Sequence, residues 1–280
     1  MSSTFSRCVL FSSVIVLTAC GGGGGGGDGG GSPQAEVVGE DGIRTNIYNT
    51  NLVQTFPWQG IPYPYDNWDY YPTCEGNEYL YKDCEYVEPP EWNDNTYEAL
   101  KRWNIESEGL IPVKHNDVPE AIFAMDTIEA KLGKLLFDRN SILNTPDEEI
   151  ERGIIASAGT ALGHGNKPDS QACGHVGAVG GSVSMPSDPW YDNTGNIFGP
   201  LQVNVGSDHP DGCTNGADLK KIAVHEFMHA IGFGAHFKGF GIGPTYDDNA
   251  WNALHNLYSN QLLTKKEDLQ ITKKYPTQGE

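Results

Sequence analysis

Residues 224–237 read V-H-E-F-M-H-A-I-G-F-G-A-H-F and hold two histidines and a glutamate at a spacing suited to metal chemistry. Side chains four residues apart on a helix share a face, so His225 and His229 are expected to point the same way, one turn apart. This is the spacing at which two imidazoles bind one Zn²⁺ ion. Glu226 lies about 100° round the helix, beside the metal, where it can take a proton from a zinc-bound water.

The residues that follow supply a helix end and a third histidine. Gly232 predicts the end of the helix, because glycine adopts the left-handed cap conformation at little cost. The chain can then turn and bring His236 back as the third ligand, with Gly234 as a second flexible point. Three protein ligands leave one position of a tetrahedral zinc ion open, which is typical of catalytic rather than structural sites.

The stretch H-E-F-M-H-A-I-G-F, residues 225–233, resembles the zinc helix of the metzincin clan of metallopeptidases, in its astacin-like spelling. Two features depart from the clan's pattern: Ala235 stands where the third histidine is usual, with His236 after it, and no methionine follows Met228 to form a Met-turn. A looser agreement in the order of elements covers residues 97–260. The resemblance implies an α+β fold with a mixed, twisted sheet, two main helices and a zinc-binding helix.

Other residues compete for some of these roles. Aspzincin-like enzymes complete H-E-x-x-H with an Asp in a G-T-x-D segment, and here residues 243–247 read G-P-T-Y-D, which makes Asp247 the runner-up to His236. His255 lies in an expected helix and is interpreted as a packed or solvated residue. Tyr246 and Tyr258 are both candidates to stabilise an oxyanion, as a tyrosine does in some metzincin-like enzymes.

The function that these residues predict is a zinc-dependent endopeptidase acting on a polypeptide substrate. Bound Zn²⁺ lowers the pKa of water towards neutrality and polarises the scissile carbonyl, and Glu226 is the expected general base. Two other functions stay open. One is a non-catalytic cell-surface protein with a structural zinc site, and the other is an adhesin or glycan binder built on the aromatic residues 56–71.

The N-terminal residues indicate export. Residues 1–19 hold Arg7 and short apolar runs, which is typical of a signal peptide and too short for a membrane span. The sequence L-T-A-C that ends at Cys20 resembles a bacterial lipobox, which implies that Cys20 is lipidated. Residues 20–33 are glycine-rich and form a flexible tether. We therefore expect a lipid-anchored protein of the bacterial cell envelope, at the outer membrane or cell surface, with extracellular release as an alternative.

Charge and cysteine usage agree with an exported chain. The net charge of −19, from 37 acidic and 18 basic residues, disfavours nucleic acid as a partner. Four cysteines remain outside the export signal, and an even number in an exported chain predicts two disulfides. Three pairings are possible. The favoured one joins Cys74 to Cys84, which are close in sequence, and Cys173 to Cys213 by elimination.

The chain after the tether divides into two parts. Residues 34–96 are rich in Tyr, Trp, Pro and Asn without a lasting period, so we expect a loop-rich extension pinned by a disulfide and packed on the catalytic domain; a removable propeptide is the alternative. Residues 97–280 are the expected zinc metallopeptidase domain. Its predicted elements are strands at 110–113, 153–158, 181–185 and 201–205, helices at 118–137, 217–231 and 249–260, and loops at 163–165, 174–177 and 237–244.

A second metal site, for Ca²⁺, is an alternative use of one loop. Asp188, Asp192, Asn193 and Asn196 supply the oxygen atoms that Ca²⁺ prefers. Their spacing matches no established calcium loop.

Overall fold

The computed structural model describes residues 37–52, 98–159, 173–178, 191–192, 194–206, 213 and 217–275. Over these ranges the chain has a mixed α/β fold with five α-helices and a mixed sheet. Several predictions concern residues outside the described ranges and are not tested here. They are the signal peptide 1–19, Cys20, the tether 20–33, the aromatic residues 56–71, the pair Cys74–Cys84, the loop 163–165 and the strand 181–185.

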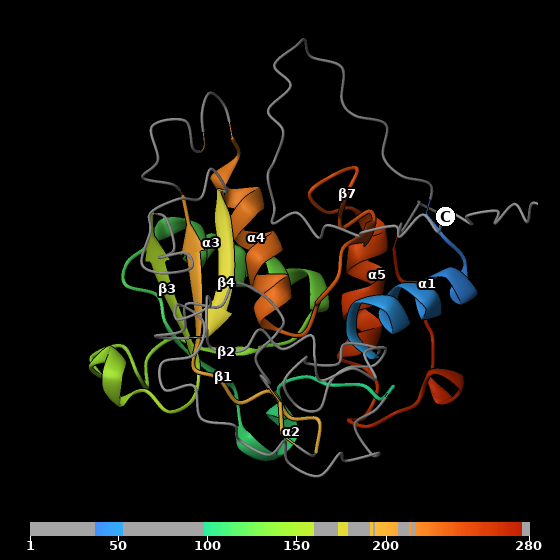
Figure 1. Ribbon diagram of the computed structural model, residues 1–280, viewed down its shortest axis with the longest axis horizontal. Coiled ribbons are helices and arrows are strands. Elements are labelled where there is room, and N and C mark those ends of the chain that lie inside the picture. Colours follow the sequence, from blue (N-terminus) through green and yellow to red (C-terminus); the bar gives the residue numbers. More distant parts are fainter. Residues whose placement is uncertain are drawn as a thin grey trace, which may run out of the picture.

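A five-stranded sheet, ordered β2-β1-β3-β5-β4, forms the centre of the described fold (Figure 1). Neighbouring strands run parallel, except that β4 pairs antiparallel with β5. The predicted strands near 110–113, 153–158 and 201–205 are confirmed. The strands are β1 Ile111–Lys114, β2 Phe137–Asp138, β3 Ile154–Ala158, β4 Gly174–Ala178 and β5 Leu201–Val205.

The edge strand β4 corrects the expectation of a loop at residues 174–177. All five of its residues pair with β5, from Gly174 opposite Val205 to Ala178 opposite Leu201. Two glycines in five residues lower the strand propensity, which is why the sequence pattern concealed this strand. The pairing with β5 supplies the hydrogen bonds that outweigh this local preference.

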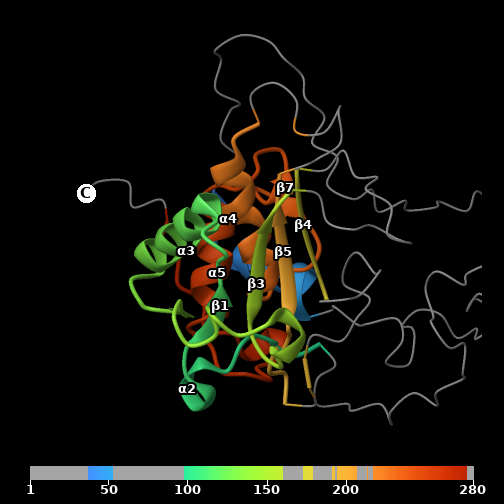
Figure 2. The same cartoon turned by 90° about the vertical axis from the view of Figure 1, so that its left-hand side faces the viewer.

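Two long helices, α3 (Pro119–Leu132) and α4 (Leu219–Ala230), lie on the same side of the strands (Figure 2). They pack on each other, and α4 also packs on β4 and β5. Both helices and α5 (Asp248–Leu257) were predicted. α3 ends earlier than expected because Gly133 adopts the left-handed cap conformation, with φ 71°. The remaining elements are α2 (Ile105–Glu108) and 3₁₀ turns at Asp147–Glu149 and Lys266–Asp268.

The N-terminal segment is helical where the structure describes it, which corrects the expectation of a loop-rich extension there. α1 covers Glu40–Ile47 and continues as a π-helical turn over Tyr48–Leu52. α1 packs beside α5 (Figure 1). The side chains that face the main core and are fully buried are Ile43, Ile47 and Leu52. Only these apolar residues mark the inner face, too few to reveal a helical period in the sequence.

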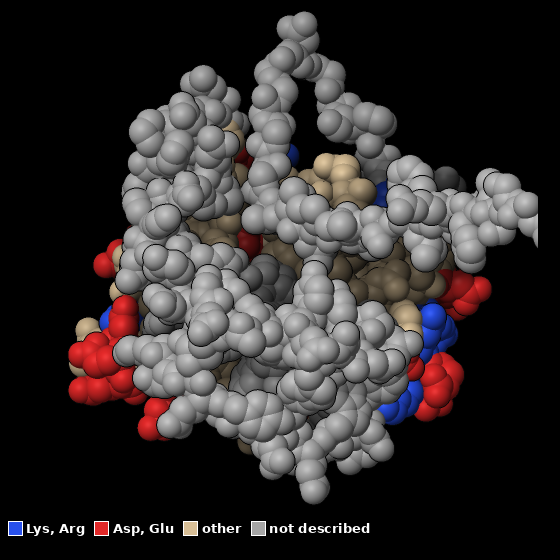
Figure 3. Space-filling model, in the orientation of Figure 1, with Lys and Arg blue, Asp and Glu red and all other residues tan. Residues whose placement is uncertain are grey.

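Two short strands follow α4, β6 (Phe237–Lys238) and β7 (Gly241–Ile242), which pair with each other inside the predicted loop 237–244. Cys173 and Cys213 form a disulfide, as predicted. Among the described residues, no helix has both the length and the apolar character that crossing a membrane requires. Figure 3 shows acidic side chains gathered at one margin of the molecule, where the Asp147–Glu149 turn lies in Figure 1.

Candidate metal centre

The helix that carries the first two histidines, α4, is fixed at both ends. Asp218 caps its N-terminus by accepting a backbone N–H of the first turn at 3.2 Å. At the other end Phe233 N donates to Met228 O and Gly232 N donates to His229 O, each at 3.0 Å, which is the bond pair of a Schellman motif. Gly232 has φ 131°, a conformation that favours glycine, so the predicted helix end is confirmed.

Three side chains from distant parts of the chain bind the backbone carbonyls of residues 230–232. Trp103 Nε1 donates to the first of these carbonyls at 2.9 Å, and the Tyr258 hydroxyl donates to the second at 2.9 Å. Asn51 Nδ2 donates to the third at 2.7 Å. The last carbonyls of a helix have no partner within the helix, so these bonds hold the end of α4 in one position.

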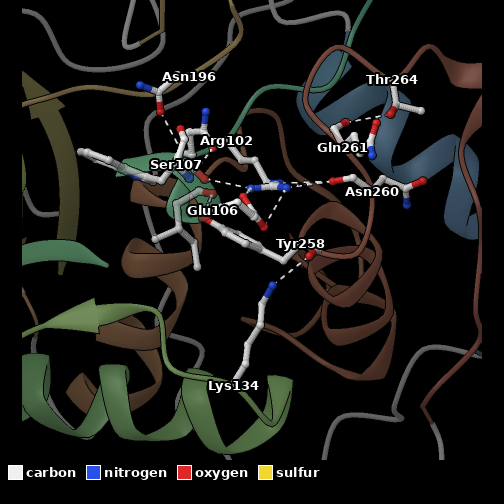
Figure 4. A network of polar contacts seen from close by, with 12 residues as sticks. Arg102, Glu106, Ser107, Lys134, Asn196, Tyr258, Asn260, Gln261 and Thr264 are labelled. Atoms are coloured by element: carbon white, nitrogen blue, oxygen red, sulfur yellow. Dashed lines mark hydrogen bonds and ion pairs between the residues drawn. The ribbon is translucent and has the colours of Figure 1, made fainter. Parts of the chain in front are cut away.

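Tyr258 is itself held by a polar network (Figure 4). Its backbone carbonyl accepts Lys134 Nζ at 2.8 Å, and the Arg102 guanidinium lies 5.3 Å from its ring. Arg102 is buried and donates to the Asn260 carbonyl at 3.0 Å and to Glu106 at 2.8 Å. Burial raises the pKa of the Tyr258 phenol. Because this hydroxyl is bound to the end of α4, Tyr246 is the better of the two oxyanion candidates.

The three predicted metal ligands come together in one cluster. His225 and His229 project from α4, and His236 comes from the loop that follows. The Nε2 atom of His225 lies 3.1 Å from that of His229 and 3.1 Å from that of His236, and the third distance is 3.2 Å. Within the described part of the chain, this is the one group of three or more His, Cys, Asp or Glu side chains that could hold a metal ion.

The hydrogen bonds of two of these rings determine which nitrogen carries the proton. His225 Nδ1 lies 2.9 Å from the Thr245 carbonyl, and His229 Nδ1 lies 3.0 Å from the Phe233 carbonyl. A carbonyl oxygen only accepts hydrogen bonds, so both Nδ1 atoms must donate. In neutral rings the two Nε2 atoms then carry lone pairs, which face each other at 3.1 Å. A cation placed between these lone pairs would turn a repulsion into two bonds.

Burial keeps the three rings neutral. Burial lowers the pKa of His225 to about 4, and the nearby His236 adds to this effect. Burial also lowers the pKa of His229 well below its ordinary value, with the other two histidines adding to it, and lowers the pKa of His236. Histidine binds metals in its neutral form, so the cluster is already in the state that a metal ion requires.

Phe240 forms an apolar floor for the histidine cluster. It is fully buried, and its ring centroid lies 4.2 Å from that of His225, 4.9 Å from His229 and 5.5 Å from His236. The next residue, Gly241, lies against the His236 ring so closely that a Cβ there would be 2.5 Å from it. Sequence reasoning treated this segment only as a loop and missed Phe240. An aromatic residue among the glycines after a candidate metal ligand was the available signal.

Glu226 is buried near the histidines and touches the edge strand β4. Only 4% of it is exposed, and a Cβ on Gly174 would lie 2.5 Å from Glu226 Oε1. Burial raises the pKa of Glu226 to about 8. The sequence did not single out Gly174, although an isolated glycine in a strand often marks a close approach of this kind.

The alternative third ligands lie outside the cluster. Asp247 Oδ1 accepts the Asn249 backbone N–H at 2.7 Å and so caps the N-terminus of α5. His255 lies on α5, where burial lowers its pKa. Neither residue belongs to the group of close ligand atoms formed by the three histidines.

The described calcium candidates use their oxygen atoms within the protein. Asp192 Oδ1 accepts the backbone N–H of Thr194 at 2.7 Å and its hydroxyl at 2.5 Å. Asn196 Oδ1 accepts a backbone N–H from Asn104 at 2.8 Å. These bonds form a turn rather than a set of inward-facing oxygens. The other two candidates, residues 188 and 193, lie outside the described ranges.

The site therefore combines three neutral imidazoles, a buried glutamate side chain and an apolar floor, and the imidazoles can hold a metal ion. Its ligands come from one helix and the loop after it, and their supports come from residues about 130 and 180 positions earlier in the chain. No protein-family model, curated protein or solved structure matches this chain.

Proposed function

We propose that the protein is a zinc-dependent endopeptidase and that the histidine cluster is its metal site. The observation that carries the proposal is that the Nε2 atoms of His225, His229 and His236 lie 3.1–3.2 Å from one another. Zn–N bonds of about 2.0–2.1 Å at tetrahedral angles place nitrogens roughly 3.3–3.4 Å apart. The observed 3.1–3.2 Å is close to this spacing, and imidazole is a preferred zinc ligand.

The protein's own groups then have separate tasks in peptide hydrolysis. A bound Zn²⁺ supplies Lewis-acid polarisation of the scissile carbonyl and a lower pKa for water. Burial alone favours the protonated form of Glu226, and a cation bound at the histidines would favour its ionised form. In that form Glu226 accepts a proton from the attacking water and passes it to the leaving amine. The bonds from His225 Nδ1 and His229 Nδ1 to backbone carbonyls keep the rings oriented while this happens. The apolar contact with Phe240 limits access of water to the rings from that side.

The substrate class that fits the surroundings is an extended peptide. β4 is an edge strand of the described sheet, and its first residue, Gly174, touches Glu226. A peptide that pairs with a sheet edge gains main-chain hydrogen bonds without requiring a particular side chain. Strand addition at β4 would bring a peptide bond towards the histidine cluster.

Two alternative functions are less well supported. A structural zinc site would need a fourth ligand, and among the described residues no fourth His, Cys, Asp or Glu joins the cluster. Glu226 would also have no role in such a site. The adhesin or glycan-binding alternative depends on residues 56–71, which lie outside the described ranges. The disulfide Cys173–Cys213 is of the kind found in oxidising compartments and so supports the expected export.

The test is replacement of the proposed general base. Zinc-loaded Glu226→Gln should keep its metal and lose about 10²–10⁴-fold in the rate of casein cleavage, the usual contribution of a general base. Glu267→Gln is the matched control, because Glu267 is exposed and lies far along the chain in a 3₁₀ turn. Full peptidase activity in a zinc-loaded Glu226→Gln protein would contradict the proposal.

A further inference from the structure

We propose that Thr50 and Asn51 are positioning residues for the third ligand, His236. They fix the backbone of residues 232–235, the turn that returns His236 to the other two histidines. This inference rests on the proposed metal site and deepens it, because it gives the N-terminal segment a part in metal binding.

Thr50 is fully buried and binds two peptide units of the turn. Its hydroxyl donates to the Ala235 carbonyl at 2.7 Å. Gly234 N donates to the Thr50 carbonyl at 2.6 Å and to its Oγ1 at 3.1 Å. Since the Ala235 carbonyl belongs to the peptide unit that leads into His236, the hydroxyl restrains the backbone directly before the ligand.

Asn51 ties the start of the same turn to another part of the core. Its Nδ2 donates to the Gly232 carbonyl and to the Lys101 carbonyl, both at 2.7 Å, and its Oδ1 accepts Lys101 N at 3.0 Å. The amide thus uses both its donor and its acceptor atoms. Together the two residues hold the turn at positions 232, 234 and 235.

The turn needs this support because of its own composition. Gly232 and Gly234 each lose more conformational freedom on ordering than other residues, and fixing one residue costs about 1–2 kcal/mol. The turn also holds one residue more than the metzincin pattern has between the glycine and the histidine. Contacts that order the turn before a metal binds mean that metal binding does not have to supply the free energy of ordering it. This is the effect of preorganisation.

The segment that supplies these contacts is anchored in the folded domain. The buried Lys101 ammonium donates to the carbonyls of Leu52 at 2.8 Å, Ala99 at 2.9 Å and Asn51 at 3.4 Å. Ile43 and Ile47 of α1 are fully buried in the main core. Residues 48–52 therefore stabilise the turn that carries His236. A removable propeptide would instead block the site and would not be needed to hold it together.

The test compares Thr50→Val, which keeps the shape and removes the hydroxyl, with Thr50→Ser, which keeps the hydroxyl. Thr45→Val is the matched control, since the exposed Thr45 hydroxyl binds only Asp41 of its own helix at 2.8 Å. Zinc affinity is measured by chelator competition, and ligand geometry from the visible spectrum of the Co²⁺-loaded protein. Thermal unfolding of the metal-free proteins confirms that each variant is folded.

We expect Thr50→Val to bind zinc about 10–100-fold more weakly, the usual loss when an outer-shell partner is removed, and to show an altered Co²⁺ spectrum. Thr50→Ser should restore both properties, and Thr45→Val should leave them unchanged. Thr50→Ala removes the same hydroxyl with less bulk and takes the place of Thr50→Val if that protein does not fold. Unchanged affinity and spectrum without the hydroxyl, or no recovery in Thr50→Ser, would overturn the inference. A wild-type protein that binds neither ion would refute the metal site itself.

Discussion

Two helices of this protein carry buried polar side chains four residues apart, and they differ in what those side chains meet. On α4, His225 and His229 turn their Nε2 lone pairs towards each other at 3.1 Å. Asn252 and Asn256 on α5, and Asn260 just after it, are also buried, but each binds the backbone of the C-terminal tail. The same spacing therefore produces a candidate metal ligand set in one helix and bonds that hold the C-terminal tail in the other.

Each asparagine binds both the backbone N–H and the backbone carbonyl of one residue of the tail. In each case the amide Nδ2 donates to a tail carbonyl while Oδ1 accepts a tail N–H, which uses both functions of a neutral amide. The exchanges are Asn252 with Tyr275, Asn256 with Thr272 at 2.7 and 2.8 Å, and Asn260 with Gln270 at 2.8 and 2.9 Å. The tail, which includes buried Tyr275, is thereby fastened along α5.

The difference shows that burial and spacing alone do not identify a site. The asparagine row is chemically complete within the protein, because every donor faces an acceptor. The pair of histidines on α4 places an acceptor opposite an acceptor, and a cation resolves that arrangement. We therefore expect metal ions to stabilise the protein through the histidines of α4 and not through the asparagines.

The largest effect should be seen on adding and removing metal. Zinc at about 1,000 times its Kd should raise the free energy of unfolding by about 4 kcal/mol, because it binds only the folded protein. Asn256→Ala should keep this rise and lower the metal-free stability by about 1–3 kcal/mol, since buried backbone groups lose their partner. His229→Ala should lose the rise. Urea denaturation with zinc and with a chelator measures both quantities.

Either of two results would break this contrast between the helices. A full zinc-dependent rise in His229→Ala would place the metal elsewhere in the chain. Loss of the rise in Asn256→Ala would show that the asparagine row and the metal site are one coupled unit. Ser259→Ala serves as the control just after α5, because this exposed hydroxyl donates to the His255 carbonyl and not to the tail.

The sequence predicted those parts of the fold that have strong local signals. The strands near 153–158 and 201–205 and the helix near 217–231 follow from apolar runs and a helical period, and the structure has them. β4 was missed because its pairing with β5 is a non-local contact that overrides two glycines. The N-terminal helix was missed because its few apolar residues acquire meaning only when α5 lies beside them.

The residues of the candidate site also fall into two groups, those with a local sequence signal and those that depend on the fold. The H-E-x-x-H spacing is a local property of one helix, so His225, Glu226 and His229 could be found from sequence alone. His236 required a judgement about loop length. Thr50 could not be found, because its role depends on contacts with the turn that only the folded chain creates. Phe240 left only a weak signal, an aromatic residue among glycines, and its contact with the rings appears only in the folded chain. The asparagines on α5 and just after it did leave a signal in the sequence, N-x₃-N-x₃-N, which was not recognised.

A smaller, pH-dependent effect should come from Lys101, a buried group whose bonds are satisfied but which can titrate. Burial lowers its pKa to about 7, the neighbouring Lys265 adds to this, and Glu98 opposes it. Between pH 7 and 10.5 the unfolded chain then binds a proton that the folded chain does not. Stability contributed by this group is therefore lost as pH falls through the folded pKa and rises with increasing pH in this window, by at most about 1.4 kcal/mol per pH unit.

Comparison with Lys101→Met isolates this contribution. The variant loses the bonds to three carbonyls, which adds a constant offset, but it has nothing to titrate at this position. The wild-type minus variant difference in free energy of unfolding, measured at pH 7.5, 8.5 and 9.5 with chelator present, should rise with pH. A difference that stays flat would mean that the carbonyls of Asn51, Leu52 and Ala99 keep the ammonium charged despite its burial.

The smallest effect should come from Tyr258, which lies between the two helices compared above. It follows α5, and its hydroxyl binds the Ile231 carbonyl at the end of α4 at 2.9 Å. Tyr258→Phe removes that one bond and should lower the free energy of unfolding by about 1 kcal/mol. The other two side chains bound to this helix end, Trp103 and Asn51, remain in place, so zinc affinity should change little.

The same variant separates a bracing role from a catalytic one. An oxyanion-stabilising tyrosine would cost about 10²–10³-fold in kcat when its hydroxyl is removed, whereas a brace should cost no more than roughly threefold. Tyr246→Phe in the same assay is the matched comparison, because Tyr246 is the other candidate and packs against Trp251, with 5.4 Å between the ring centroids. A loss of kcat above about 100-fold in zinc-loaded Tyr258→Phe would return this residue to the reaction. The bond to Ile231 would then have to open when substrate binds, and the end of α4 would be a moving part instead of a fixed support.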